Sequence, residues 1–219
     1  MYILKPYIFN NYPEILFGFS TKISLEAKSP YYFNLSYSVG DDKNIVDKNR
    51  KDFFEEVGLC IESVGYQRQI HSDIVQVIGC GGDNGASDAL ITHEKNLGLA
   101  IAVADCTPIF LYDIKNKVVA AVHSGWQGTE QKILFKTLMK MHTDFSSKSE
   151  NIVAYIGPSI SQPNYEVGKE VAELFDDSFV KPKGEKYLLD VSGINYNILV
   201  NFGIPKNQIQ KSELCTFEF

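Results

Sequence analysis

The stretch VADCTPIFLYD, residues 103–113, decides the fold prediction, because it has the composition of a core strand and yet holds an acid and a cysteine. A second apolar run, KVVAAVHS at 117–124, ends in histidine and serine. Continuous apolar runs of this kind are typical of strands that are covered on both faces. Side chains that can bind a metal, placed where a rigid sheet gives way to a loop, predict a functional site at that edge.

Further strands and helices are predicted from the spacing of apolar residues along the chain. The other expected strands are 13–24, which runs into a loop, 73–79, 97–105 and 151–160. The expected helices are 43–57, ended by Gly58, then 128–145, 168–177, and 195–202, ended by Gly203. No repeat or linker interrupts the pattern. We therefore expect one α/β (α+β) domain over residues 1–219, with layered mixed β-sheets flanked by helices.

The composition excludes several classes of protein. The net charge of −6 and the pI near 5.3 argue against nucleic acid as a partner. No apolar run approaches the roughly 20 residues that a membrane helix needs, and the N-terminal residues lack the basic stretch of a secretory signal. Four widely spaced cysteines without a CxxC pair favour free thiols and a cytoplasmic location, while the oligomeric state stays open.

Three side chains form the candidate metal site: His71, Cys106 and His123. A cysteine and two histidines supply three of the four tetrahedral positions of zinc and leave the last one open, as in catalytic zinc sites. Copper is also possible, because it binds the same types of ligand. The alternative for Cys106 is a buried thiol that only fills space. His93 and His142 are expected in a loop and near a helix end, where they need no ligand role.

Five blocks occur in order along the chain: QIHSDIV, SDALIT, VADCTPIFLYD, AAVHSGWQGT and YIGPSI. Together they resemble the YfiH-type family, also called the laccase-domain or multicopper polyphenol oxidase-like family, from about residue 18 to residue 217. The resemblance implies a single α/β domain and a metal site made by the histidine of QxH, the cysteine of ADC and the histidine of AxHxGW. In this chain those residues are His71, Cys106 and His123, the set that the strand ends also indicate.

Members of that family are regarded as purine nucleoside phosphorylases. The resemblance therefore implies phosphorolysis of adenosine, inosine, guanosine and methylthioadenosine, with deamination of adenosine alongside, and purine nucleosides and phosphate as partners. Deamination needs activated water and a carboxylate that moves protons near the purine. Asp105 and Asp88 are the candidate catalytic residues. The alternative for each is a structural role at a turn, and Asp105 is also a candidate to orient a histidine ligand.

A phosphate site is expected in glycine-rich turns, because their backbone N–H groups bind anions. The candidates are the turn HSGWQGT, with Gln127, and the turn IGPSI, with Gly157. Gln127 stands where the family commonly has a basic residue. Arg50, which matches an Asn-Arg pair of the family, is expected to supply the charge instead, although a solvated helix face is its alternative. Trp126, the single tryptophan, either stacks on the base or packs in the core.

Several alternatives stay open. The family usually continues past the CT block, at 215–216 here, into an aromatic, arginine-containing segment that this sequence lacks, which would reduce activity if that segment closes the pocket. The other candidate functions are a copper-dependent polyphenol oxidoreductase, a metal-free cysteine hydrolase with Cys106 as nucleophile and His123 or His71 as base, and a purine-binding protein without activity. Oxygen reduction by several coppers needs many histidines, and this chain has four.

Overall fold

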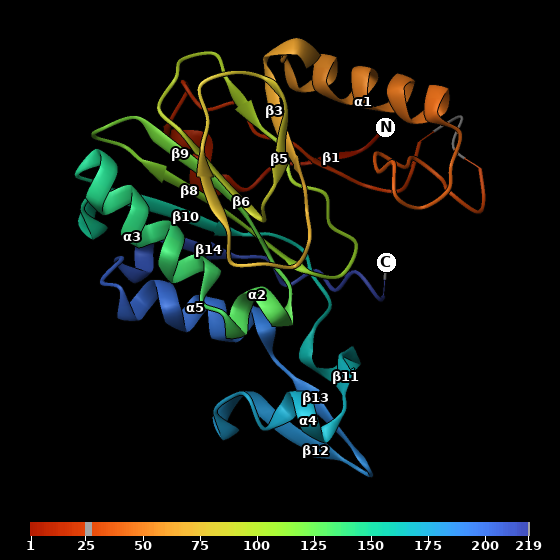
Figure 1. Ribbon diagram of the computed structural model, residues 1–219, viewed down its shortest axis with the longest axis vertical. Coiled ribbons are helices and arrows are strands. Elements are labelled where there is room, and N and C mark those ends of the chain that lie inside the picture. Colours follow the sequence, from red (N-terminus) through yellow and green to blue (C-terminus); the bar gives the residue numbers. More distant parts are fainter. Residues whose placement is uncertain (25–27, 219) are drawn as a thin grey trace.

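The computed structural model describes residues 1–24 and 28–218 and is built on a six-stranded mixed sheet (Figure 1). Its strands are β4 Val75–Val77, β6 Ala89–Thr92, β8 Thr107–Asp113, β9 Val118–Ser124, β10 Ile152–Ile156 and β14 Ile209–Lys211. They lie in the order β14, β10, β8, β9, β6, β4. Neighbours are antiparallel except for two parallel pairs, β10 with β14 and β4 with β6.

Helices lie against one face of this sheet. They are α2 Trp126–Glu130, α3 Ile133–Phe145 and α5 Val191–Asn201. Successive side chains of a strand point to opposite faces, so Ala120 and Val122 of β9 face the helices and pack in one core with Leu138 of α3. The same alternation turns Ala121 and His123 to the opposite face of the sheet. The helix–sheet core therefore determines which way the histidine of β9 points.

A second layer lies on the opposite side of the six-stranded sheet. It contains helix α1 Lys43–Val57, a three-stranded sheet of β3 Val64–Arg68, β5 Gly82–Ala86 and β7 Gly98–Leu99, and the pair β1 Ile3–Leu4 and β2 Phe19–Ser20. Strand β3 is central and parallel to both neighbours. Val64 of β3 packs against Phe53 and Phe54 of α1. Side chains from both layers line one large cavity.

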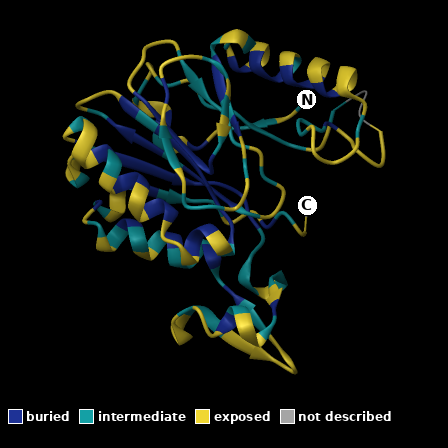
Figure 2. Ribbon diagram, in the orientation of Figure 1, coloured by how far each residue is buried: buried dark blue, intermediate teal, exposed yellow. Residues whose placement is uncertain are grey.

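Residues 166–189 form an arm that projects from the rest of the molecule (Figure 1). The arm comprises β11 Glu166–Val167, α4 Lys169–Ala172, β12 Val180–Lys183 and β13 Lys186–Leu189, and its antiparallel strands lie in the order β11, β13, β12. Figure 2 shows that much of its surface is exposed. Its small apolar cluster contains Val167, Ala172 and Leu189, and Trp126 of α2 packs against that cluster.

The predicted fold class is confirmed, because mixed sheets are combined with helices in one layered α/β arrangement. The predicted helix at 43–57 is also confirmed, and Gly58 ends it in the left-handed conformation, with φ of 92°. Within the described ranges 1–24 and 28–218, no helix has both the length and the apolar character that spanning a membrane requires.

Several predicted elements differ in extent from the observed ones. The helix expected at 168–177 is limited to Lys169–Ala172, and the one expected at 195–202 begins earlier, at Val191. The helix expected at 128–145 is interrupted, because Lys132 adopts a left-handed conformation with φ of 65° between α2 and α3. The strand expected at 97–105 pairs only at Gly98–Leu99, and the strand expected at 13–24 pairs only at Phe19–Ser20. Cys106 accordingly precedes β8 and does not lie within it.

Packing of α3 on the sheet generates a stability prediction. Leu138 is fully buried, so Leu138→Ala should lower the free energy of unfolding by about 2–5 kcal/mol through lost burial and the cavity left behind. The neighbouring Met139 is 38% exposed, and Met139→Ala should change the free energy of unfolding by less than about 0.5 kcal/mol. Urea unfolding of both variants measures the difference. Equal effects would contradict the packing described.

Candidate metal centre

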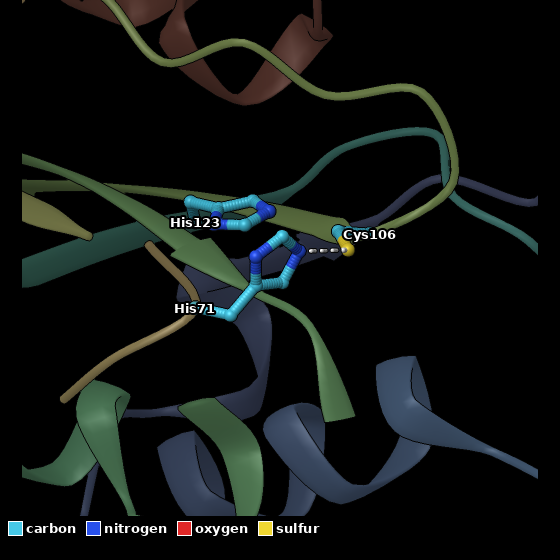
Figure 3. Close-up of side chains that lie close together, drawn as sticks. All are labelled: His71, Cys106 and His123. Atoms are coloured by element: carbon cyan, nitrogen blue, oxygen red, sulfur yellow. Dashed lines mark hydrogen bonds between the residues drawn. The ribbon is translucent and has the colours of Figure 1, made fainter. Parts of the chain in front are cut away.

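The structure brings His71, Cys106 and His123 together at one end of the six-stranded sheet (Figure 3). Each side chain offers one ligand atom, and these atoms all lie within 4.8 Å of one another. Nε2 of His71 lies 4.0 Å from Sγ of Cys106, and the two imidazole rings meet edge to face with centroids 4.9 Å apart. The three residues come from separate places in the chain, as the sequence pattern predicts.

Strand pairing sets the positions of two of the three side chains. In the antiparallel register of β8 and β9, Thr107 lies opposite Ser124, and Pro108 lies opposite His123. Cys106 therefore emerges directly beside the end of β9, next to the histidine. His71 belongs to a turn ahead of β4 and has a left-handed backbone, with φ of 58°. That conformation is uncommon for a residue with a Cβ and requires support from its surroundings.

Asp88 supplies this support, although it lies 17 residues from His71 in sequence. Its carboxylate accepts backbone N–H bonds from Ile70 (3.3 Å), His71 (3.0 Å) and Ser72 (2.7 Å), and one from the Ser72 hydroxyl (2.7 Å). Oδ1 of Asp88 also lies 2.8 Å from Nδ1 of His123. Asp88 is fully buried. The Asp88 side chain thus holds both histidines: it binds the backbone N–H of His71 and the ring of His123.

The charges of this pair follow from competing effects. Burial by itself raises the pKa of Asp88, but the hydrogen bonds from His123 and Ser72 outweigh it and lower the pKa to about 2. Burial by itself lowers the pKa of His123, but the bonds to Asp88 and Cys106 outweigh it and raise the pKa to about 9. The Asp88 contact occupies Nδ1 of His123, so Nε2 is the nitrogen left for a metal.

The donor set fits a divalent metal of zinc type. With zinc–nitrogen bonds of roughly 2.0–2.1 Å and zinc–sulfur bonds of roughly 2.3 Å, tetrahedral ligand atoms lie roughly 3.3–3.6 Å apart. Nε2 of His71 and Sγ of Cys106 lie 4.0 Å apart, which is somewhat longer than that. A carboxylate behind a histidine ligand is the usual second partner in such sites. Asp88 has that position relative to His123.

Gly125 leaves the space that the cluster needs. A Cβ added there would lie 2.9 Å from Sγ of Cys106 and 3.3 Å from Cδ2 of His71. Its φ of −73° is open to any residue, so the requirement is for space and not for backbone conformation. The glycine after the histidine in HSGW is thus explained by contact with both other members of the cluster.

Gln69 is a positioning residue that the sequence analysis missed. Its side-chain Nε2 donates to the carbonyl oxygen of Ala102 and its Oε1 accepts from the N–H of Ala102, both at 2.7 Å. This two-way bond ties the turn before His71 to the irregular segment that leads to Cys106. The QxH block carried the signal, because a glutamine two residues before a ligand can hold a neighbouring backbone.

Asp105 and Asp88, the two predicted catalytic carboxylates, differ in their surroundings. Asp105 lines the large cavity together with the three members of the cluster, and its Oδ1 accepts a hydrogen bond of 2.7 Å from the Thr216 hydroxyl. Asp88 is fully buried, and the hydrogen bonds described above occupy both its oxygens. This geometry favours the structural role that was the alternative for Asp88, because its carboxylate positions both histidines.

Arg50 lines the same cavity, which has a volume of about 2320 Å³. It belongs to α1 and is 9% exposed, with Nη1 donating to the Leu35 carbonyl oxygen at 3.2 Å. Its guanidinium lies 4.6 Å from the ring centroid of Tyr66 and 5.1 Å from that of Tyr37. Nη2 is buried and has no hydrogen-bond partner within residues 1–24 and 28–218. The solvated helix face that was the alternative for Arg50 is therefore not observed.

The other residues predicted to contact phosphate or the base lie outside the cavity. Of the described residues that line the cavity, none is Trp126, Gln127 or Gly157. Trp126 packs against the arm, and Gln127 is exposed to solvent. The N–H of Gly157, expected to face an anion, donates to the Pro108 carbonyl oxygen at 2.9 Å. A Cβ at Gly157 would lie 2.9 Å from Cγ of Pro108, which explains the glycine by packing.

Comparisons with known proteins show what this arrangement resembles. A family model described as multi-copper polyphenol oxidoreductase laccase matches residues 17–219. A purine nucleoside phosphorylase of Bacteroides thetaiotaomicron is 33% identical over 203 residues, which cover 84% of this chain and 75% of that protein. Adenosine deaminase RL5, from an unknown prokaryotic organism, is 31% identical over 216 residues, which cover 90% of this chain and 82% of that protein.

A solved structure has the same fold. The hypothetical protein YfiH of Bacillus licheniformis superposes with a TM-score of 0.85 at 29% sequence identity. The match covers 91% of this chain and 82% of that one. The likeness therefore extends over both layers of the molecule and is not confined to the sheet that carries the cluster.

The space at Gly125 generates a prediction. Gly125→Ala should raise the dissociation constant for added zinc by roughly tenfold or more, because the new methyl group would displace Cys106 and His71 from positions in which they can share one ion. Gly79→Ala is the matched control, because a Cβ there meets nothing within 4 Å. Zinc titration against a competing chelator measures both variants. Equal affinities would show that the cluster does not depend on this space.

Proposed function

The chain belongs to the multi-copper polyphenol oxidoreductase laccase family, the YfiH-type family, and from that premise we propose that it is a zinc-dependent purine nucleoside phosphorylase of the cytoplasm that also deaminates adenosine. The observation that carries the proposal is the cluster of His71, Cys106 and His123 inside a large cavity. Relatives named purine nucleoside phosphorylase and adenosine deaminase support the two activities. Adenosine, inosine, guanosine and methylthioadenosine are the proposed nucleosides.

His71, Cys106 and His123 would hold the metal, with copper as the alternative ion. When bound, zinc supplies Lewis-acid polarisation and the activation of water near neutral pH. The protein contributes the fixed positions of the ligands. Asp88 holds His123 through Nδ1 and the His71 backbone through its N–H, so both histidines are oriented before a metal arrives.

Asp105 is the proposed residue for proton transfer. It is adjacent to the ligand Cys106, it lines the cavity, and Thr216 contacts only one of its two oxygens among the described residues. The other oxygen can exchange a proton with the purine base as it leaves ribose. In phosphorolysis the bond between C1′ of ribose and N9 of the base breaks, a phosphate oxygen bonds to C1′, and the base keeps the electron pair and gains a proton.

Arg50 is the proposed charge for phosphate. A buried guanidinium without a carboxylate partner is costly unless an anion completes its hydrogen bonds. The unpartnered Nη2 and the aromatic rings that fix the guanidinium support this role. Phosphate is an anion of matching geometry, because arginine can donate two parallel N–H bonds to it. Arg50 thus takes the place of the basic residue that is missing at Gln127.

One second candidate has an observation in its favour. Sγ of Cys106 lies 4.0 Å from Nε2 of His71, a contact that would also suit a cysteine nucleophile and a histidine base. The copper-dependent polyphenol oxidoreductase has less support. Of the four histidines, His93 contacts Phe145 and His142 contacts the Ser147 carbonyl oxygen, so only two belong to the cluster.

Product analysis tests the proposed reaction. Protein purified without added metal should contain zinc, and with phosphate it should convert adenosine to adenine and ribose 1-phosphate and, in a second reaction, to inosine. A strong chelator should abolish both reactions and added zinc should restore them. Cys106 should alkylate slowly in the zinc-loaded protein and faster after stripping, because a metal-bound thiolate has its lone pair engaged.

Peptide mapping supplies the control for alkylation, because the exposed Cys60 should label at the same rate in both forms. Free ribose in place of ribose 1-phosphate would contradict phosphorolysis. Turnover that resists the chelator, together with a covalent adduct on Cys106, would favour the cysteine hydrolase instead. Cys106→Ala that keeps its full zinc content would exclude the proposed ligand set.

The phosphate site has its own test. Arg50→Met removes the charge but keeps an apolar stem. It should raise KM for phosphate by roughly 10- to 100-fold, because that factor corresponds to the loss of a hydrogen bond to a charged group. Arg50→Lys should have a KM for phosphate between those of Arg50→Met and the parent. Gln127→Arg is the control and should leave KM for phosphate unchanged, because Gln127 does not line the cavity. An unchanged KM in Arg50→Met would remove Arg50 from the site.

A further inference from the structure

Gln67 carries a buried amide whose polar atoms lack partners. Gln67 is the fourth of the five residues of β3 and is 8% exposed. Neither Nε2 nor Oε1 has a hydrogen-bond partner in the part of the chain that the structure describes, residues 1–24 and 28–218. Buried amides in folded proteins are nearly always hydrogen-bonded, so an unpaired one needs an explanation. Gln67 also lines the cavity that contains the metal cluster.

Strand alternation indicates which way Gln67 points. Val64 packs against α1, and the ring of Tyr66 lies against Arg50 of α1, so these two residues face the helix. Gly65 and Gln67 therefore face the other side. A Cβ added to Gly65 would overlap Ile78, whose N–H bonds to the Ile91 carbonyl oxygen at the edge of the six-stranded sheet.

His123 lines the same cavity from the six-stranded sheet. On β9, Ala120 and Val122 belong to the helix-facing core, which leaves Ala121 and His123 on the face turned toward the second layer. Ala121, His123 and Gln67 all line the cavity. Gln67 and the cluster of His71, Cys106 and His123 thus line one cavity from opposite layers.

We propose that the Gln67 amide recognises the purine base of the nucleoside, by pairing with the N1 and 6-substituent edge. This inference rests on the proposed function, because it assumes that a purine nucleoside enters this cavity. An amide offers a donor and an acceptor side by side. Adenine presents an acceptor at N1 and a donor at its 6-amino group, and hypoxanthine presents the reverse pattern. Rotation of the amide by half a turn matches either base, so one glutamine can accept both classes of nucleoside.

The amide is also well suited because it is uncharged. A carboxylate at this position would accept hydrogen bonds only, and it would reject N1 of adenine. An apolar side chain would leave the polar edge of the base unpaired in a buried place, which is the situation that discriminates most strongly against a ligand. Gln67 therefore explains how a cavity with mainly apolar neighbours can select a purine without a charged group.

The test compares Gln67→Met with the parent on two substrates. Phosphorolysis of inosine and of purine riboside, which lacks the 6-oxygen and the N1 proton, is measured as kcat/KM. The parent should prefer inosine, and Gln67→Met should lose roughly 10- to 100-fold on inosine but little on purine riboside, because two neutral hydrogen bonds are removed. Without ligand, the melting temperature of Gln67→Met should rise, since an unpaired amide is replaced by an apolar chain.

Gln76→Met is the matched control. Gln76 bonds to the Ala86 carbonyl oxygen and is not among the described residues that line the cavity, so the ratio of the two substrates should not change. An unchanged ratio in Gln67→Met, with the parent active, would overturn this inference and leave the proposed function standing. A fallen melting temperature with unchanged kinetics would show the amide to be structural and would also overturn it.

Calorimetric binding of inosine in phosphate-free buffer separates the two failures. One outcome is that the parent binds inosine in this buffer and yet fails to convert it once phosphate is added. If Gln67→Met then binds inosine more weakly than the parent, the inference is supported and the proposed reaction fails. If the parent neither binds nor converts inosine, both are overturned.

Discussion

The hydrogen bonds of one buried carboxylate hold the candidate site together. Asp88 binds the N–H groups of the turn that carries His71 and the ring of His123, and its own carbonyl oxygen accepts the N–H of His123 at 2.8 Å. It thereby joins two strands of the six-stranded sheet to a turn in which His71 has an unfavourable backbone conformation. Loss of Asp88 would leave the buried ring of His123 and the N–H groups of the His71 turn without their partner at once, which is a destabilising change.

The cavity between the two layers depends on a different balance. The six-stranded sheet buries one face completely under helices, but its other face meets a layer that closes over it only in part. Arg50 and Gln67 lie at that boundary, and within residues 1–24 and 28–218 Nη2 of Arg50 and both amide atoms of Gln67 have no hydrogen-bond partner. Both arrangements lower the stability of the free protein, because desolvated polar groups are not compensated. Such groups become favourable when a ligand supplies the missing hydrogen bonds, which ties the stability of this layer to occupancy of the cavity.

The three members of the cluster could be proposed from the sequence, because side chains able to bind a metal stand where apolar runs give way to loops. The resemblance to a known family then selected the same three residues. The sequence indicated a structural role at a turn as one alternative for Asp88, but not that it holds both histidines. That contact depends on a turn many residues earlier and on a left-handed conformation at His71. The break at Lys132 has no glycine or proline to signal it. The run at 97–105 was predicted as a strand from its apolar composition, although Gln69 binds the backbone of Ala102 there in place of a neighbouring strand.

The position of Trp126 affects how the protein can be observed in solution. It is the only tryptophan in the chain, and it packs against the apolar cluster of the arm and not in the cavity. Its emission spectrum consequently senses the polarity at the contact between the arm and α2. Fluorescence-detected denaturation will follow the separation of that contact, whereas circular dichroism follows the helices and sheets of the whole molecule. Where the two curves diverge, the arm detaches independently of the layers around His71, Cys106 and His123.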